Sequence, residues 1–174
     1  MWIVISFLHP EIHLTSAADK MKIELIFVGK TSEKYIEEGM KVYLKRLIHY
    51  APVSVTVVGS SSLQDRETVI KKEAEAILSK INSRDFVILL DERGKELTSV
   101  QLADFFQKQM VGGASRIVFI IGGAFGVSEA VQKRSNLVLS FSKFTLTHQM
   151  IRLFLVEQVY RAMTIIRNEA YHHS

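Results

Sequence analysis

The sequence predicts a single α/β domain with a mainly parallel sheet and helices on both faces. Short apolar runs alternate along the chain with longer segments of helical periodicity, a pattern typical of repeated strand-helix-strand units. Most of these runs are continuously apolar, as expected of strands that are buried on both faces. At 174 residues the chain is long enough for one hydrophobic core, and no linker or repeat divides it.

Five strands and five helices are expected in alternating order. The expected strands are 23–28, 53–58, 86–90, 117–121 and 137–139. The expected helices are 32–49, 65–81, 98–110, 128–133 and 148–167. The last helix is apolar around well over half of its circumference, which is more than packing on one sheet face needs. This favours a two-fold homodimer, although burial within its own domain would explain the same pattern.

Residues 1–20 precede the patterned part of the chain. They begin with an apolar run, but no Lys or Arg comes before it and Pro10 interrupts it, so the segment is a poor signal peptide. Met21 leads directly into the first expected strand. We therefore expect an N-terminal extension over 1–20 that is not part of the fold, and one domain over 21–174. A protein that starts at Met21 should fold and keep its activity.

Composition excludes several classes of function. The absence of cysteine rules out disulfides, thiolate metal sites and thiol nucleophiles, and it fits a reducing compartment such as the cytoplasm. Without thiolate ligands, no metal is expected. No transmembrane helix is expected either, because no uninterrupted apolar run is long enough to span a membrane. Residues 128–174 hold six Lys or Arg against three Asp or Glu. This local excess suits an RNA partner, but it also suits an ordinary solvated surface.

Three loops that follow expected strands contain most of the candidate site residues. They are the polar loop 91–99, the glycine loop 122–126, and the loop 140–147, in which Ser and Thr alternate with apolar residues. The carboxyl ends of parallel strands meet at one edge, so these loops should line one crevice for a polar ligand with a flat ring. A branched side chain at Gly123 should fill that crevice rather than the core. Ordinary turns, with Thr147 as a helix N-cap, would explain the same residues.

The glycine loop lacks the features of two common nucleotide sites. A dinucleotide-binding fingerprint would need glycine at position 121, where the chain has Ile121, and an acidic residue about 20 positions later, where 142–146 contains none. The P-loop motif does not occur in the sequence. A nicotinamide or flavin oxidoreductase and a P-loop NTPase are therefore disfavoured.

From Met21 to its end, the sequence resembles the RlmH-type enzymes of the SPOUT class of RNA methyltransferases. The motifs of that family occur here in the same order and with the same spacing. The matching residues are Leu90-Asp91, Gly94-Lys95, Ile121-Gly122-Gly123, Gly126, Ser140 through His148, Glu157-Gln158, Tyr160-Arg161-Ala162 and Tyr171-His172. Two positions depart from the family pattern: Thr147 replaces the usual proline, and His173 replaces Arg or Lys.

The resemblance implies a C-terminal trefoil knot and S-adenosyl-L-methionine as the cofactor, bound in a bent form among three knot loops. It also implies methylation of N3 of a pseudouridine in large-subunit ribosomal RNA, in assembled ribosomes. The cofactor-binding residues that it implies are Leu90, Gly123, Ser142, Lys143, Phe144, Thr145, Leu146 and Thr147.

The acceptor of such a methyl group is an imide N–H that must lose its proton. The candidate proton handlers are His148, Tyr171 and His172, and Arg152 is a candidate for stabilising the imide anion. Each of these residues could equally have a structural role, and the sequence does not choose among them. Because of its two departures from the family pattern, a non-catalytic RNA- or ribosome-binding protein with the same fold is the alternative function.

Overall fold

The computed structural model describes residues 21–59 and 65–172. The expectations for residues 1–20 and for His173 lie outside the described residues. In the described ranges, strands and helices alternate as the sequence predicts, ten elements in all. None of these helices is long and apolar enough to cross a membrane.

Within the described residues, five parallel strands form one sheet in the order β2-β1-β4-β3-β5. The strands are β1 (Lys22–Val28), β2 (Val53–Val58), β3 (Phe86–Glu96), β4 (Arg116–Ile121) and β5 (Leu137–Ser140). The central strands β1 and β4 are almost entirely buried, which explains why their sequences are continuous apolar runs. The predicted α/β class with a parallel sheet is confirmed.

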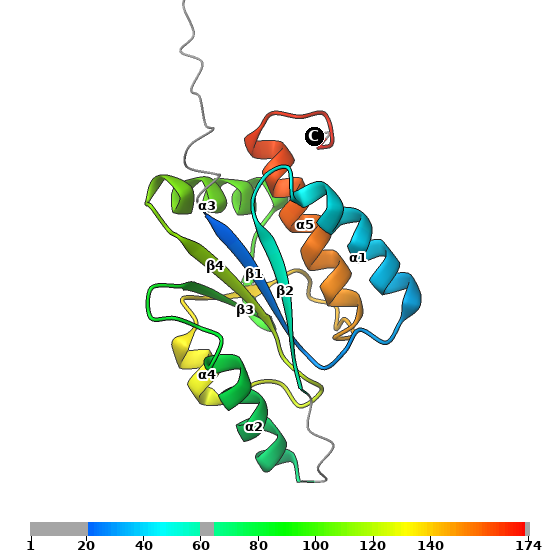
Figure 1. Cartoon of the computed structure of the whole chain (residues 1–174), viewed down its shortest axis with the longest axis vertical. Coiled ribbons are helices and arrows are strands. Elements are labelled where there is room, and N and C mark those ends of the chain that lie inside the picture. Colours follow the sequence, from blue (N-terminus) through cyan, green and yellow to red (C-terminus); the bar gives the residue numbers. More distant parts are fainter. Residues whose placement is uncertain (1–20, 60–64, 173–174) are drawn as a thin grey trace, which may run out of the picture.

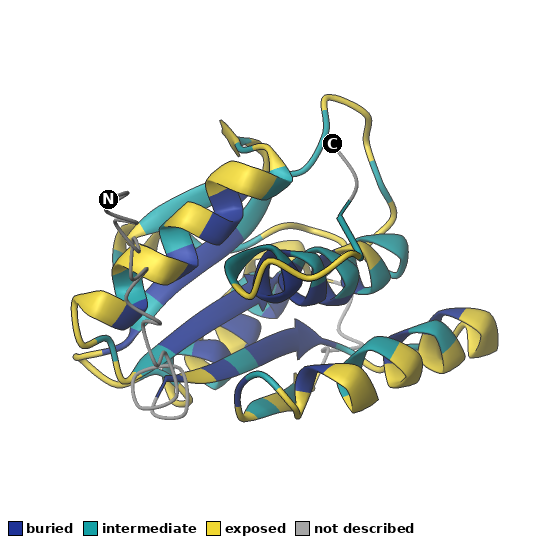
Figure 2. Cartoon of the chain, turned by 90° about the horizontal axis from the view of Figure 1, so that it is seen from above, coloured by how far each residue is buried: buried dark blue, intermediate teal, exposed yellow. Residues whose placement is uncertain are grey.

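Helices cover both faces of the sheet, so the molecule has three layers (Figures 1 and 2). One face packs against α1, α3 and α5, and the other against α2 and α4. Their bounds are α1 (Lys34–Leu47), α2 (Arg66–Leu78), α3 (Ser99–Val111), α4 (Glu129–Arg134) and α5 (Met150–Ile166). Each helix lies within two residues of its expected bounds, except that α2 ends at Leu78, three residues early.

The strand β3 is longer than the expected strand 86–90. Both Leu90 and Lys95 pair with Leu139 of β5, and the residues between them bulge out of the ladder. A Cβ atom at Gly94 would lie 2.6 to 2.8 Å from backbone atoms of Leu139 and Ser140, which leaves room only for glycine. The expectation of a loop beginning at residue 91 is therefore wrong, because Lys95 and Glu96 rejoin the sheet beside β5.

The apolar helix α5 lies between α1 and α3 on the sheet. Most of its apolar circumference is thus covered within its own chain. Burial within its own domain therefore explains most of the apolar pattern. Phe154 is the exception, because 43% of its surface is exposed. Leu153 packs against Gly39 of α1, where the two helices approach closely.

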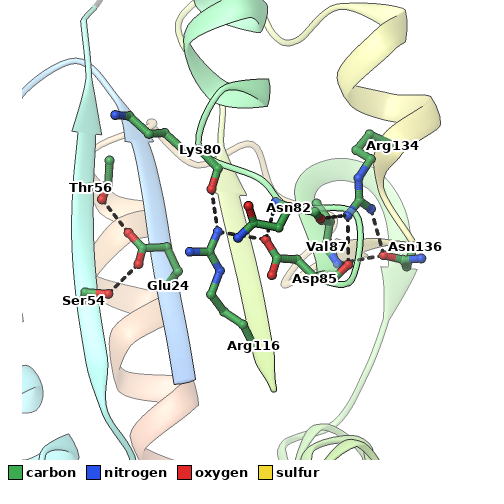
Figure 3. Close-up of polar contacts among 10 residues, drawn as sticks. All are labelled: Glu24, Ser54, Thr56, Lys80, Asn82, Asp85, Val87, Arg116, Arg134 and Asn136. Carbon is green, nitrogen blue, oxygen red and sulfur yellow. Dashed lines mark hydrogen bonds and ion pairs between the residues drawn. The ribbon is translucent and has the colours of Figure 1, made fainter. Parts of the chain in front are cut away.

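At the amino ends of the strands, opposite the three loops, Figure 3 shows a network of polar side chains. Asp85 is buried and pairs with Arg116 of β4 at 2.8 Å. Arg134 of α4 donates hydrogen bonds to the backbone carbonyls of Asn82 and Asp85 at 2.6 and 3.0 Å. The network therefore joins the α2–β3 connection to β4 and α4, and it fixes the sheet from the edge away from the site.

We expect Asp85→Ala to lower the free energy of unfolding by about 3 kcal/mol, because it leaves the largely buried Arg116 guanidinium without its carboxylate. Denaturant titration followed by circular dichroism measures the change. The control is Asp104→Ala at an exposed position of α3, which should change stability by less than about 0.5 kcal/mol. Equal stability of the two variants would show that the Asp85–Arg116 pair contributes nothing.

Candidate cofactor and catalytic site

A cavity of about 400 Å³ lies at the carboxyl ends of β3, β4 and β5. Its lining comes from three segments, residues 90–93, 121–127 and 139–151. The three loops therefore meet at one crevice, as the sequence predicts. The volume lies in the range of small-molecule sites in proteins, and both polar and apolar side chains form the walls.

The glycine loop forms one wall of the cavity. Gly126 has a left-handed backbone with φ of 82°, and its N–H donates to the carbonyl of Gly123 at 3.0 Å. A Cβ atom at Gly123 would lie 2.8 Å from a carboxylate oxygen of Glu73 and 3.1 Å from the Val28 side chain. The expectation that a branched side chain at Gly123 would fill the crevice rather than the core is wrong, because that direction points toward α2 and β1.

The loop after β5 is held by its own hydroxyl groups. The Ser140 hydroxyl donates to the Ser142 carbonyl at 2.9 Å, and the Ser142 hydroxyl accepts from the Phe144 N–H at 2.9 Å. Such local side-chain bonds give the loop a defined backbone without a ligand. Ser142, Phe144 and Leu146 contribute to the cavity lining.

Lys143 and Thr145 instead connect this loop to β3 and its bulge. The Lys143 ammonium lies 3.5 Å from a carboxylate oxygen of Glu96, and the Thr145 hydroxyl donates to Glu92 at 3.1 Å. Neither Lys143 nor Thr145 belongs to the described lining of the cavity. These contacts hold two cavity walls together.

Asp91 and Arg93 form a charged pair on the β3 side of the cavity. The Arg93 guanidinium donates two hydrogen bonds to the Asp91 carboxylate, both at 2.8 Å. This pairing holds the pKa of the Asp91 carboxyl below its usual value, so the group is ionised at neutral pH. Neither Asp91 nor Arg93 was among the expected cofactor-binding residues, although they follow Leu90 by one and three positions in the expected polar loop.

Thr147 and His148 lead from the loop into α5. The Thr147 hydroxyl accepts a hydrogen bond from the Met150 N–H at 3.1 Å, so it caps the helix as the sequence suggests. His148 contributes to the cavity lining and is exposed to solvent. The next residue, Gln149, bonds to the backbone of Lys30 and Ser32, which ties the start of α5 to the loop after β1.

Arg152 is fully buried below this loop. Its guanidinium donates to the Thr31 hydroxyl at 2.9 Å and to the Val28 carbonyl at 2.7 Å, and it lies 5.1 Å from the centre of the Phe27 ring. Burial lowers the pKa of this guanidinium. Arg152 therefore lies beneath the end of β1, and the described cavity lining does not include it.

Tyr171 follows α5 and packs against it, and neither Tyr171 nor His172 belongs to the cavity lining formed by the described residues. The Tyr171 hydroxyl donates to Glu157 at 3.1 Å. Burial raises the pKa of this hydroxyl well above its usual value, and the nearby Tyr43 and Glu157 add to the effect. Tyr171 thus keeps its proton at neutral pH and is unsuited to act as a general base.

A family model described as "Predicted SPOUT methyltransferase" matches residues 21–172. The chain belongs to the SPOUT methyltransferase family. Membership makes it a methyltransferase, implies a methyl donor, and implies the C-terminal trefoil knot that the resemblance led us to expect. The cavity at the carboxyl ends of β3 to β5 is therefore the candidate donor site of a SPOUT enzyme.

Curated relatives named "Ribosomal RNA large subunit methyltransferase H" match nearly the same part of the chain. The protein of this name from Christiangramia forsetii is 44% identical, with 88% of this chain and 99% of the relative covered. The one from Parabacteroides distasonis is 45% identical over 88% of this chain and 99% of the relative. The one from Bacillus pumilus is 46% identical, with 87% and 99% covered.

Proposed function

We propose that this chain transfers a methyl group from S-adenosyl-L-methionine to N3 of a pseudouridine in large-subunit ribosomal RNA, in assembled cytoplasmic ribosomes. The observation that supports it best is the combination of SPOUT family membership with relatives that are named for this RNA and match almost end to end. The cavity at the carboxyl ends of β3, β4 and β5 has a volume suited to a small-molecule methyl donor, which supports the proposal.

The cavity residues fit this cofactor chemically. Leu90, Leu146 and Ile151 are apolar side chains suited to the two faces of an adenine ring. The glycine loop exposes backbone groups, and the Ser142 hydroxyl offers a further hydrogen bond. Asp91 is ionised but paired with Arg93, so the two together add a polar edge without net charge to this wall. We assign Leu90, Gly123, Ser142, Phe144 and Leu146 to direct cofactor contact, and Lys143, Thr145 and Thr147 to holding the loop.

When bound, S-adenosyl-L-methionine supplies an electrophilic methyl group. The new N–C bond forms as the S–C bond breaks in line, so the chain must hold both reactants and accept the imide proton. Positioning alone can be worth about 7–11 kcal/mol in favourable cases. His148 is the candidate proton acceptor at the cavity, because it is exposed there and has an imidazole nitrogen that can take up the proton.

The terminal residues enter this proposal through a homodimer. Tyr35 and Val42 of α1 are 61% and 49% exposed, and Phe154 of α5 is 43% exposed. Large exposed apolar residues on two adjacent helices favour a second copy of the chain as their cover. Packing through α1 and α5 would bring the C-terminal segment of one copy, with His172, to the cavity of the other, where an imidazole ring suits an unstacked base.

The test has two steps. Calorimetric titration with S-adenosyl-L-methionine should show one site per chain, and mass spectrometry of ribosomal RNA after incubation with assembled ribosomes should show one added methyl group. Cofactor binding without any methylated RNA would favour the alternative, a non-catalytic RNA- or ribosome-binding protein. Absence of cofactor binding would contradict the assignment of the cavity.

A further inference from the structure

None of the motif residues Glu157-Gln158 and Tyr160-Arg161-Ala162 belongs to the described lining of the cavity. Gln158 accepts a hydrogen bond from the Ser99 hydroxyl at 2.8 Å, and Ala162 is buried in the core. Glu157, Tyr160 and Arg161 instead meet the C-terminal segment, which returns along α5 after the helix ends (Figure 1).

The return begins with a specific turn at Asn168. This residue has a left-handed backbone with φ of 53° and is the one described non-glycine residue with positive φ. Its N–H donates to the Ile165 carbonyl at 2.9 Å, and the N–H of Glu169 donates to the Thr164 carbonyl at 2.9 Å. These two bonds are those of a Schellman motif, in which asparagine is tolerated in place of glycine. The turn reverses the chain toward the middle of α5.

After the reversal, three side chains of α5 hold Tyr171. Its hydroxyl donates to Glu157, the Arg161 guanidinium lies 4.7 Å from the centre of its ring, and the Tyr160 ring meets it edge-on at 4.8 Å. Glu157 and Arg161 are themselves ion-paired one helical turn apart. We call Glu157, Tyr160 and Arg161 the tyrosine clamp.

A second group of the same composition holds the turn itself. The Tyr50 hydroxyl donates to Glu169 at 2.5 Å, and the Arg167 guanidinium lies 4.7 Å from the centre of the Tyr50 ring. The Tyr160 ring contacts the Tyr50 ring, at 5.7 Å between centres, as well as that of Tyr171. Each end of the returning segment is thus held by its own group of a tyrosine, a carboxylate and an arginine.

We propose that the tyrosine clamp positions the C-terminal segment for methyl transfer, so that Glu157, Tyr160 and Arg161 are positioning residues. This inference rests on the proposed function, in which the terminal residues take part in the reaction. His172 is partly buried and directly follows the clamped tyrosine. Because Tyr171 is held against α5, the backbone that carries the His172 ring is held there too. Glu157 and Arg161 also lie on the same side of α5 as the exposed Phe154, at spacings of three and seven residues. The clamp therefore presents His172 from the face that a second copy would cover.

Two changes at Asn168 provide a matched test that leaves the clamp side chains in place. Asn168→Gly keeps the left-handed turn, because glycine adopts positive φ without strain, whereas the branched side chain of Asn168→Val opposes it. Glu157→Gln tests the clamp directly, because it removes the charge and keeps the shape. Fluorine NMR of protein labelled with fluorotyrosine reports the environment of Tyr171, whose signal is assigned with Tyr171→Phe.

We expect Asn168→Val and Glu157→Gln to shift the Tyr171 signal toward that of a solvated tyrosine. Their kcat for ribosomal RNA methylation should fall roughly ten- to a hundredfold, with the Kd for S-adenosyl-L-methionine unchanged. Asn168→Gly should keep both the signal and the rate. The proposal would be overturned if Asn168→Val or Glu157→Gln shifts the Tyr171 signal but leaves kcat at the wild-type value. It would also be overturned if neither variant changes the Tyr171 signal. Inactivity of the wild-type protein would contradict the proposed function instead, and the fluorine signal would still test the clamp.

Discussion

Removing residues 171–174 is expected to lower methylation of ribosomal RNA roughly a hundredfold or more, with S-adenosyl-L-methionine binding intact. The deletion removes the imidazole proposed to meet the target base and the tyrosine that positions it, and stacking of a base on such a ring contributes about 1–3 kcal/mol in addition to positioning. The cavity lining lies in other segments, so the cofactor should still bind. Single-turnover methylation and calorimetry measure the two effects separately.

A mixed dimer decides which copy the C-terminal segment serves. One subunit lacks 171–174, and the other is full length with Ala124→Trp, a bulky change at an exposed position of the cavity lining. If the segments act across the dimer, the mixed dimer regains activity at one site, although both parent homodimers are inactive. Continued inactivity of a correctly assembled mixed dimer would show that each segment serves its own cavity.

Gly94→Ala is expected to destabilise the fold by more than about 3 kcal/mol and to abolish cofactor binding. The added Cβ atom would lie 2.6 Å from the carbonyl carbon and 2.7 Å from the nitrogen of Leu139, and backbone in a paired strand cannot move aside as a side chain can. Separation of β3 from β5 would also displace two cavity walls. Denaturant titration and calorimetry measure both effects.

Gly59→Ala is the matched control for this substitution. No described atom lies within 4 Å of the position of its Cβ, and its φ is not in the left-handed range. The change should alter stability by less than about 1 kcal/mol. Similar losses in Gly59→Ala and Gly94→Ala would mean that chain stiffness, and not the contact with β5, explains the result.

The sheet was predictable because burial on both faces leaves a strong signal, a run of apolar residues with no alternation. The meeting of the three loops was predictable too, since parallel strands end at one edge. The extension of β3 was not, because the mostly polar residues 91–96 are typical of a loop, and Lys95 and Glu96 rejoin the sheet only by pairing with the distant β5. Strand pairing of this kind depends on tertiary context more than on local sequence.

For two candidate site residues, the position of the side chain depends on tertiary contacts that the sequence does not reveal. Arg152 sits on an apolar helix near the site, but the position of Val28 and Thr31 turns its guanidinium into the core. Tyr171 was a candidate proton handler, and the left-handed Asn168 returns it to its own α5, outside the described cavity lining. A polar side chain that accepts positive φ, two residues past an apolar helix, was the available signal for that turn.

The order of the strands also determines when this protein can fold during its synthesis. The central strand β1 is made first, yet one of its two neighbours, β4, follows about ninety residues later. One face of the sheet then stays only partly covered, by α1 and α3, until α5 supplies Leu155, Val156, Val159 and Met163 to the core. Pairings so distant in sequence make folding slow and leave apolar surface exposed meanwhile. The nascent chain should therefore reach its native core only after α5 has left the ribosome.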